Sequence, residues 1–143
     1  MARLVDAASE AIEHSDGWSA PGGHLDFTRA KLHYYATNAY GDVGSHAEAI
    51  AYGERSIQLY QATPTDVRSF GDEVGCYVAL AEVSVHRGSI DGASARLACV
   101  LAHPQTGHIQ LLRSMLGALR AQLASQTVYG VESRALAEQL GSF

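Results

Sequence analysis

The sequence predicts an all-α protein built from stacked helical hairpins, and a repeated phrase is the first of three observations behind this prediction. Gly44 begins the segment GSHAEAIA, which returns 44 residues later at Gly88 as GSIDGASA, with the glycine, the serine and two alanines in register. A weaker third copy begins at Gly130. A period of this size is typical of arrays in which each hairpin buries its apolar face against its neighbours.

Apolar residues at helical spacing, separated by glycine and proline, are the second and third observations. Residues 109–123 carry isoleucine or leucine at every third or fourth position, and Pro64 and Pro104 separate such stretches. We therefore expect a right-handed α-α superhelix of about seven helices without strands. The expected single domain covers residues 1–143 and comprises a half-repeat over residues 1–14 and hairpins over about 24–62, 68–103 and 107–141.

The first three helices have recognisable boundaries. Residues 2–14 carry one apolar face, and the next helix is expected over about residues 25–42, before Gly44 breaks it. Ser45 and Glu48 then have the spacing of a capping box, so we expect the Ser45 side chain to cap the third helix.

The later helices follow the same logic. Ser69 and Asp72 form a second capping-box pattern, which begins a helix that ends before Gly88. Its partner helix ends before Pro104, and a short helix over about residues 131–140 closes the array.

Three glycines, Gly53, Gly75 and Gly117, lie inside expected helices. Each should cost about 1 kcal/mol relative to alanine. We expect close helix crossings to compensate for this cost.

Composition excludes several classes of function. The formal charge is −5, Lys31 is the only lysine, and the arginines are scattered singly, so no basic stripe is present that could follow a phosphate backbone. We expect no direct nucleic-acid binding by this chain. No apolar run approaches the roughly 18 residues that span a bilayer, and the first residues do not resemble a signal peptide, so we expect a cytoplasmic protein.

Two cysteines, Cys76 and Cys99, lie at similar distances on either side of Gly88. A helical hairpin that turns there would bring them to about the same level, where they form either a redox pair or, as is more common, two small core residues of a reduced protein. Without a CxxC or Cys/His ligand pattern, we expect no metal and no cofactor.

The two clearest hairpins share a set of small, aromatic and glycine positions. These positions are Tyr40, Gly44, Ala49, Ser56 and Ile57 in the first hairpin and Leu80, Ala81, Gly88, Ala93, Val100 and Leu101 in the second. The pattern resembles the tetratricopeptide repeat. The chain departs from that family at His33, Thr37 and Gly53, which replace a tryptophan, a small residue and an aromatic residue, and its period is 44 rather than about 34 residues.

Three longer strings resemble a second, more specific family: SDGWSAPGGHLD at residues 15–26, ERSIQLY at residues 54–60 and RSFGDE at residues 68–73. They look like the C-terminal region of bacterial transcriptional regulators that join a helix-turn-helix domain to a tetratricopeptide-like sensor or dimerisation region. The resemblance implies a ligand- or peptide-sensing and protein-interaction module that lacks the DNA-binding half.

Tetratricopeptide arrays bind along a groove that is lined by exposed positions on the first helix of each hairpin. The resemblance places a peptide, protein or small-molecule effector against nine residues of this chain: Lys31, Tyr34, Asn38, Asp42, Val78, Glu82, His86, Arg113 and Arg120. Asn38 also matches the residue type that peptide-binding members use to bond a peptide backbone. Arg113 and Arg120, two turns apart, suit a carboxylate or phosphate, although a solvated helix face also explains them.

A cluster of His33, Tyr34, Tyr35 and Tyr40 is the densest group of chemically capable side chains. General acid-base chemistry would use such a His/Tyr pair, but a tyrosine stripe is more often a packed helix face, so we assign no catalytic residue. A sensing module is therefore the leading hypothesis, with an assembly adaptor and a small enzyme or biosynthetic accessory protein on the same scaffold as alternatives.

We expect the first helix to be an unfinished repeat that lacks a preceding helix to cover its apolar face. We expect the chain either to self-associate through this apolar face or to need an N-terminal partner segment, because an apolar patch of a few hundred Å² tends to be an interaction site. A homodimer is the simplest arrangement, since a two-fold contact covers the patch with its own copy. The interface residues that we expect are Leu4, Val5, Ala8 and Ile12.

Overall fold

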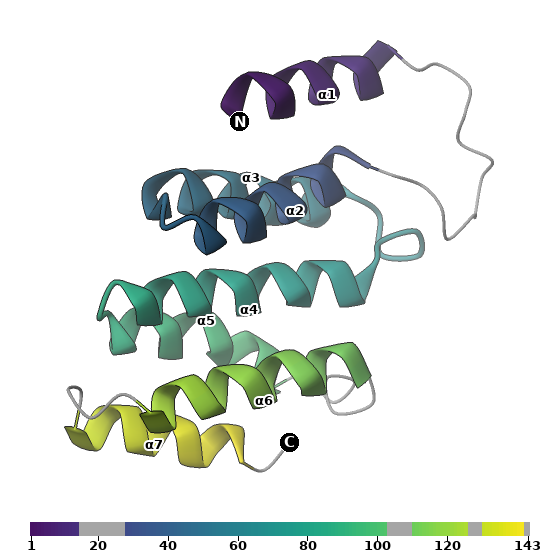
Figure 1. The fold of residues 1–143 in the computed structure, drawn as a ribbon. Helices are drawn as coiled ribbons and strands as arrows, with labels where there is room; N and C mark the ends of the chain where they lie inside the picture. The colour runs from purple at the N-terminus through teal and green to yellow at the C-terminus, as the bar shows by residue number, and fades with distance from the viewer. Residues whose placement is uncertain (15–27, 103–109, 126–129, 142–143) are drawn as a thin grey trace. The chain divides into compact units, whose positions relative to one another are not determined.

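The computed structural model describes residues 1–14, 28–102, 110–125 and 130–141, and it divides the chain into two compact units, residues 1–73 and 74–143. The described residues form seven helices and no strand, which confirms the all-α prediction (Figure 1). The helices are α1 (Ala2–His14), α2 (Arg29–Asp42), α3 (His46–Ala62), α4 (Phe70–His86), α5 (Ile90–Ala102), α6 (Gln110–Ser125) and α7 (Gly130–Leu140).

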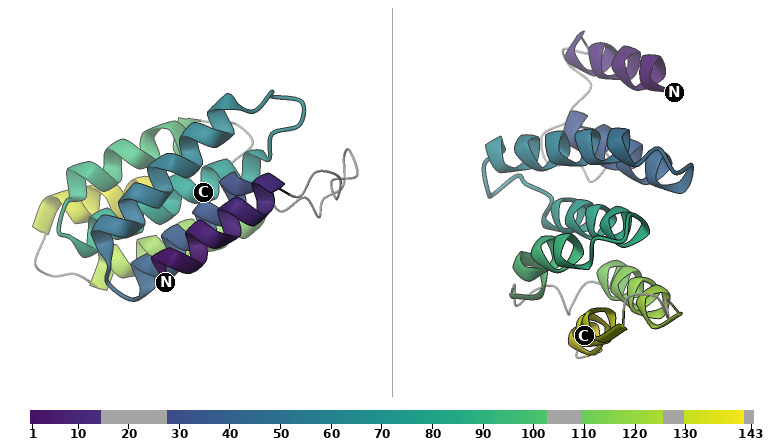
Figure 2. Two further views of the ribbon diagram at one scale, coloured as in Figure 1. Left: turned by 90° about the horizontal axis from the view of Figure 1, so that it is seen from above. Right: turned by 90° about the vertical axis from the view of Figure 1, so that its left-hand side faces the viewer.

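The first unit consists of α1, the α2–α3 hairpin and the first turn of α4. Helices α2 and α3 pack along each other, and α1 contacts α2 (Figure 2). A buried hydrogen bond crosses the hairpin, because Ser56 of α3 donates its hydroxyl to the carbonyl of Ala30 in α2 at 2.7 Å. The small residue at position 56 thus lets the two helices approach closely.

The repeated phrase of the sequence encodes a repeated turn. At the end of α2, Gly44 has φ +75° and donates to Gly41 O, and Ser45 N–H donates to Tyr40 O. This pair of bonds is a Schellman motif, in which the left-handed residue is usually glycine. It reverses the chain between α2 and α3.

The second unit repeats this turn between α4 and α5. Gly88 has φ +76° and donates to Val85 O, and Ser89 N–H donates to Ser84 O, so every bond has its counterpart 44 residues earlier. Figures 1 and 2 show α4 and α5 side by side. The weaker third copy also begins with a left-handed glycine, Gly130 at φ +57°.

The core of the second unit is almost entirely aliphatic. Helix α6 packs on α7, and α7 also contacts α5. Fully buried large side chains in this unit are Val78, Leu80, Val85, Leu97, Val100, Leu112, Leu116, Leu119 and Leu123. The leucine stripe that predicted α6 is therefore its inward face, although Ile109 lies outside the described residues.

One predicted helix start and one predicted capping bond need correction. Helix α2 begins at Arg29 rather than near residue 25, because Thr28 is extended and its hydroxyl accepts the Lys31 N–H at 3.2 Å. Ser45 occupies the N-cap position of α3 but forms no side-chain capping bond. The second capping prediction is confirmed, since Ser69 Oγ accepts the Asp72 N–H at 3.4 Å.

The expected dimer face is smaller than predicted. Leu4 is 75% exposed, but Val5 is only 8% exposed, so it was wrongly placed on an uncovered face. Ala8 is half-buried, and the side chain of Ile12 lies outside the described residues. The exposed large apolar side chains among the described residues of this segment are Leu4 of α1 and Met1, which precedes it.

Neither Cys76 nor Cys99 forms a disulfide, so the redox-pair interpretation is not supported. Cys76 is buried in α4, as a core cysteine should be, whereas Cys99 is exposed on α5. The interpretation of the two as a pair of core residues is thus right for Cys76 and wrong for Cys99.

Candidate functional site

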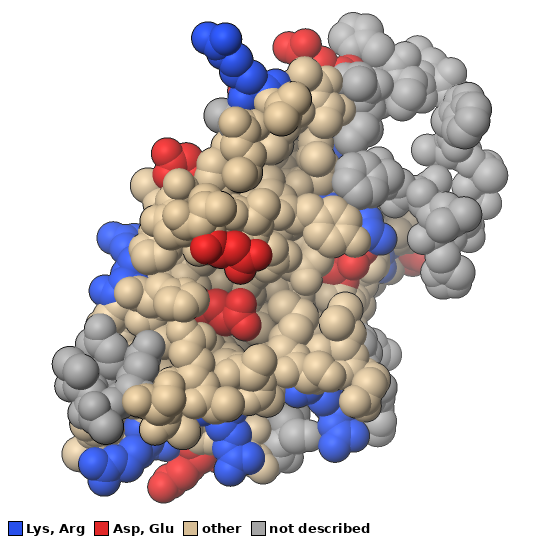
Figure 3. All heavy atoms as spheres, viewed as in Figure 1, with Lys and Arg blue, Asp and Glu red and all other residues tan. Residues whose placement is uncertain are grey.

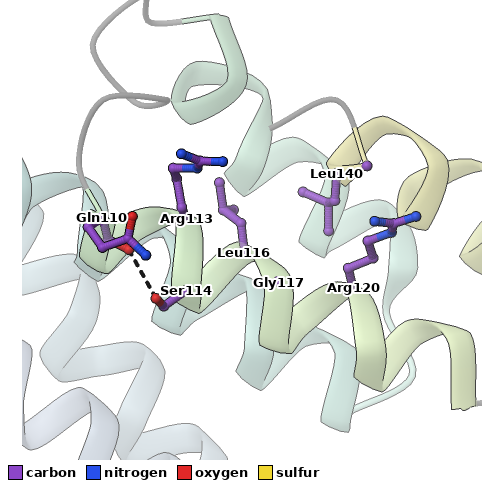
Figure 4. A pocket seen from close by; sticks show the side chains of 8 residues that line it. Gln110, Arg113, Ser114, Leu116, Gly117, Arg120 and Leu140 are labelled. Atoms are coloured by element: carbon purple, nitrogen blue, oxygen red, sulfur yellow. Dashed lines mark hydrogen bonds between the residues drawn. The ribbon is translucent and has the colours of Figure 1, made fainter.

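A hollow of about 330 Å³ opens on α6 beside the C-terminal end of α7 (Figure 4). It lies wholly within the second unit. Helix α6 supplies six of its lining residues and the end of α7 supplies two: Gln110, Arg113, Ser114, Leu116, Gly117, Arg120, Leu140 and Gly141.

Helical spacing explains why the two arginines meet at this hollow. Arg113, Gly117 and Arg120 are separated by four and three residues, so they share one face of α6. Figure 4 shows the Arg113 and Arg120 side chains on either side of Leu116, rising from the same side of the helix. Leu116 and Leu140 are buried, so the floor of the hollow is apolar and its rim is basic.

Gly117 has no packing role in the described structure. Outside its own helix backbone and its chain neighbours, no atom lies within 4 Å of the place where its Cβ would be. The prediction of a close helix crossing is therefore wrong for Gly117, whereas Gly53 and Gly75 are buried. The missing side chain instead leaves open space between the two arginines.

The charge of the hollow is uniformly positive. None of its eight lining residues is acidic, and two are arginines. On the face drawn in Figure 3, blue side chains gather along the lower edge, at the level of α6 and α7. Two guanidinium groups around an apolar floor suit an anionic group with a small hydrocarbon part.

The predicted groove residues divide between the two units. Of the residues on α2, Asp42 is exposed, and Lys31 lies 3.4 Å from the Asp72 carboxylate. Asn38 is half-buried, and its amide donates to the Tyr34 carbonyl of its own helix at 3.3 Å. Tyr34 is 7% exposed, so its expected exposure is wrong.

The remaining predicted groove residues lie in the second unit. Val78 is fully buried in α4, where an exposed position was expected. Glu82 is half-buried, and His86 is exposed and hydrogen-bonded to Gln122 of α6 at 2.8 Å. Only Arg113 and Arg120, of the nine predicted residues, line the hollow.

Sequence reasoning missed the other residues around the two arginines, namely Gln110, Ser114, Leu116, Gly117, Leu140 and Gly141. One signal was present. A glycine between two arginines on one helix face costs helix stability, and an exposed position offers no packing gain in return.

The aromatic cluster around His33 forms a stack within the first unit. Tyr52 of α3 stacks on His33 and on Tyr40, with ring centroids 5.4 Å and 5.3 Å apart. His33 is 3% exposed, and neither of its ring nitrogens has a hydrogen-bond partner among the described residues. An imidazole this deeply buried is not placed to contact a substrate, which removes the support for acid-base chemistry here.

The surroundings of this stack disfavour charge. Burial lowers the pKa of His33, and the positive charges of Arg55 and Arg29 lower it further, against the opposing effect of Asp6. Burial also raises the pKa of Tyr52, and the nearby Asp6 carboxylate raises this pKa further. Both side chains are therefore held in their neutral forms.

Comparisons with protein-family profiles, with curated proteins and with solved structures found no match for this chain. Among the described residues, no helix is both long and apolar enough to cross a bilayer. The same residues contain no group of three or more His, Cys, Asp or Glu side chains arranged to hold a metal ion.

We expect His33→Phe to raise stability at neutral pH by about 1–2 kcal/mol, because it removes a buried polar group without partners but keeps a ring against Tyr52. It should also reduce acid sensitivity. Above the ordinary histidine pKa of about 6.5, position 33 is neutral whether the chain is folded or unfolded; below it, the unfolded chain binds a proton that the folded chain resists. The contribution of a neutral His33 to the free energy of unfolding is therefore present above pH 6.5 and is lost as the pH falls.

Urea unfolding at pH 7.5 and 5.5 measures this difference, with the exposed His86→Gln as the control for loss of an imidazole. An equal loss of stability between the two pH values in wild type and His33→Phe would contradict the assignment.

We expect Gly117→Ala to stabilise the protein by about 1 kcal/mol, because alanine is the better helix former and the new methyl group meets open space. The melting temperature should rise by about 4 °C. Gly88→Ala in the same unit is the matched control and should destabilise, since its φ of +76° costs an L-residue about 1–2 kcal/mol. A lower melting temperature for Gly117→Ala would show that Gly117 has a packing role after all.

Proposed function

We propose that this chain is the ligand- or peptide-sensing, protein-interaction module of a bacterial transcriptional regulator, and that it captures an anionic group of its effector in the α6–α7 hollow. The anion is a carboxylate or a phosphate. The observation that carries the proposal is the pair of arginines around a hollow whose lining contains no acidic residue.

Gly117 supports a binding role for the hollow. A glycine in an exposed helix interior costs about 1 kcal/mol, and no contact in the described structure requires it. Stability that is given up without a packing reason is typical of functional positions. Here the gain is room for a ligand between Arg113 and Arg120.

The regulator assignment rests on the resemblance of residues 15–26, 54–60 and 68–73 to the C-terminal region of helix-turn-helix regulators. The repeated Schellman turn at Gly44 and Gly88 supports the tetratricopeptide-like, right-handed superhelix that this resemblance implies. A helix-turn-helix coding sequence in frame before Met1 would support the assignment, and a stop codon directly before it would contradict a fused DNA-binding half.

We expect Arg113→Gln and Arg120→Gln each to weaken the binding of inorganic phosphate by about tenfold or more, because each removes a charge-assisted hydrogen-bond donor. Calorimetric titration with phosphate and with a short acidic peptide measures this loss and distinguishes the two kinds of anion. Arg134→Gln is the matched control, since Arg134 is exposed on α7 outside the lining of the hollow. Equal affinities for wild type and all three variants would refute an anion site on α6.

The exposed Leu4 supports self-association, and we propose a homodimer whose contact includes this residue. Leu4→Glu should then shift the protein from dimer to monomer, because a carboxylate in an apolar two-fold contact meets its own copy. Light scattering at several concentrations measures the mass. Wild-type protein that stays monomeric at every concentration, or a Leu4→Glu variant with the wild-type dimer mass, would contradict the proposed interface.

A further inference from the structure

Arg120 lies against the end of a neighbouring helix. A methyl group on Gly141, the residue after α7, would lie 3.2 Å from both Cζ and Nη2 of Arg120. The Arg120 guanidinium therefore lies beside the residue that follows α7, and the same side chain forms one side of the hollow (Figure 4).

Helix α7 lacks a positive charge of its own at this end. Its last turn contains no basic residue, and it has only 11 residues. The last carbonyls of a helix have no partners within it and carry partial negative charge, which a nearby cation stabilises. A helix this short also depends on tertiary contacts for its stability. Arg120 thus places a positive charge near the C-terminal end of α7, where the sequence of α7 has none.

The spacing of the arginines sets the geometry of any shared anion. Arg113 and Arg120 are two turns apart, which is about 10.5 Å along the helix axis. An anion that contacts both guanidinium groups must sit between them, above Leu116 and Gly117, where space is open. We expect Arg120 to turn toward Gly117 and away from Gly141 when it contacts such an anion.

We propose that Arg120 is shared between the anion and the C-terminal end of α7, so that anion binding in the hollow loosens α7. This inference rests on the proposed anion-binding function and adds its regulatory consequence. Because the anion and the end of α7 compete for one side chain, each weakens the contact of Arg120 with the other by the same factor. A single cation at a helix terminus corresponds to a factor of about two to five.

The test is hydrogen exchange of the α7 amides, with sodium phosphate compared with sodium chloride at equal ionic strength. In wild type, phosphate should speed exchange over residues 131–140 about two- to fivefold. Arg120→Gln should raise this exchange without phosphate and abolish the phosphate response. Arg87→Gln, which removes a charge at the end of α4 outside the hollow, should keep the wild-type response.

Gly141→Ala tests the same coupling without removing a charge. The added methyl group would lie 3.1 Å from the Glu138 carbonyl of α7 and 3.2 Å from the Arg120 guanidinium, so α7 should exchange faster for both reasons. The specific sign of the coupling is that phosphate should bind about two to five times more tightly, because Arg120 no longer contacts the end of α7. Phosphate binding that leaves α7 exchange unchanged or slower would overturn the coupling while the proposed function stands. Wild-type affinity and exchange in Gly141→Ala would overturn it as well. Failure of wild-type protein to bind either phosphate or the short acidic peptide would overturn the proposed function and the coupling together.

Discussion

The left-handed glycine at the end of a helix is the constraint on which the rest of this structure depends. At Gly44 and Gly88 the chain must take a positive φ, which costs other L-residues about 1–2 kcal/mol. The Schellman bonds that follow satisfy helix carbonyls that would otherwise lack partners and return the chain along the preceding helix. Each hairpin thereby brings two apolar stripes face to face, which a single helix of this length cannot achieve.

The two units fill their interiors differently. In the first unit, polar side chains enter the core and are mostly bonded: Thr37 donates to the His33 carbonyl at 2.8 Å, and Ser56 donates to Ala30. The His33 imidazole is one exception, because it stacks on Tyr52 and neither of its nitrogens has a hydrogen-bond partner among the described residues. In the second unit, leucine and valine fill the core, so the polar residues of α6 remain on its outer face. That division places Arg113 and Arg120 on the exposed face of α6.

The limits of sequence reasoning are visible in two serines with similar spacing. Ser69 caps α4 as predicted, whereas Ser45 does not cap α3. Ser45 directly follows the turn glycine, its N–H donates to Tyr40 O, and its backbone is held at φ −81°, ψ 67°. A capping serine usually has extended backbone, so the preceding turn prevents what the local pattern predicts.

Helix existence and the inward stripe of α6 were predictable, because both follow from spacing along one helix. Which residues are buried on the other helices was harder to predict from the sequence. Val78 and Tyr34 were placed on an exposed face, but whether a helix face is covered depends on packing that no local spacing encodes. For the same reason Arg113 and Arg120 were found on α6, whereas Leu140 and Gly141 were missed, since they meet the arginines only through the packing of α7 on α6.

The small size of the expected coupling determines what kind of response Arg120 can produce. A fivefold shift moves an open population from about 10% to about 36%, whereas near-complete switching needs a factor of about 10⁴. One arginine therefore gives a graded response. Leu136 and Leu140 of α7 are buried, so we expect their apolar contacts to keep the helix in place while its last turn responds. A stronger response would require an effector that also contacts Leu140, because only then would binding oppose the apolar packing as well as the polar contact.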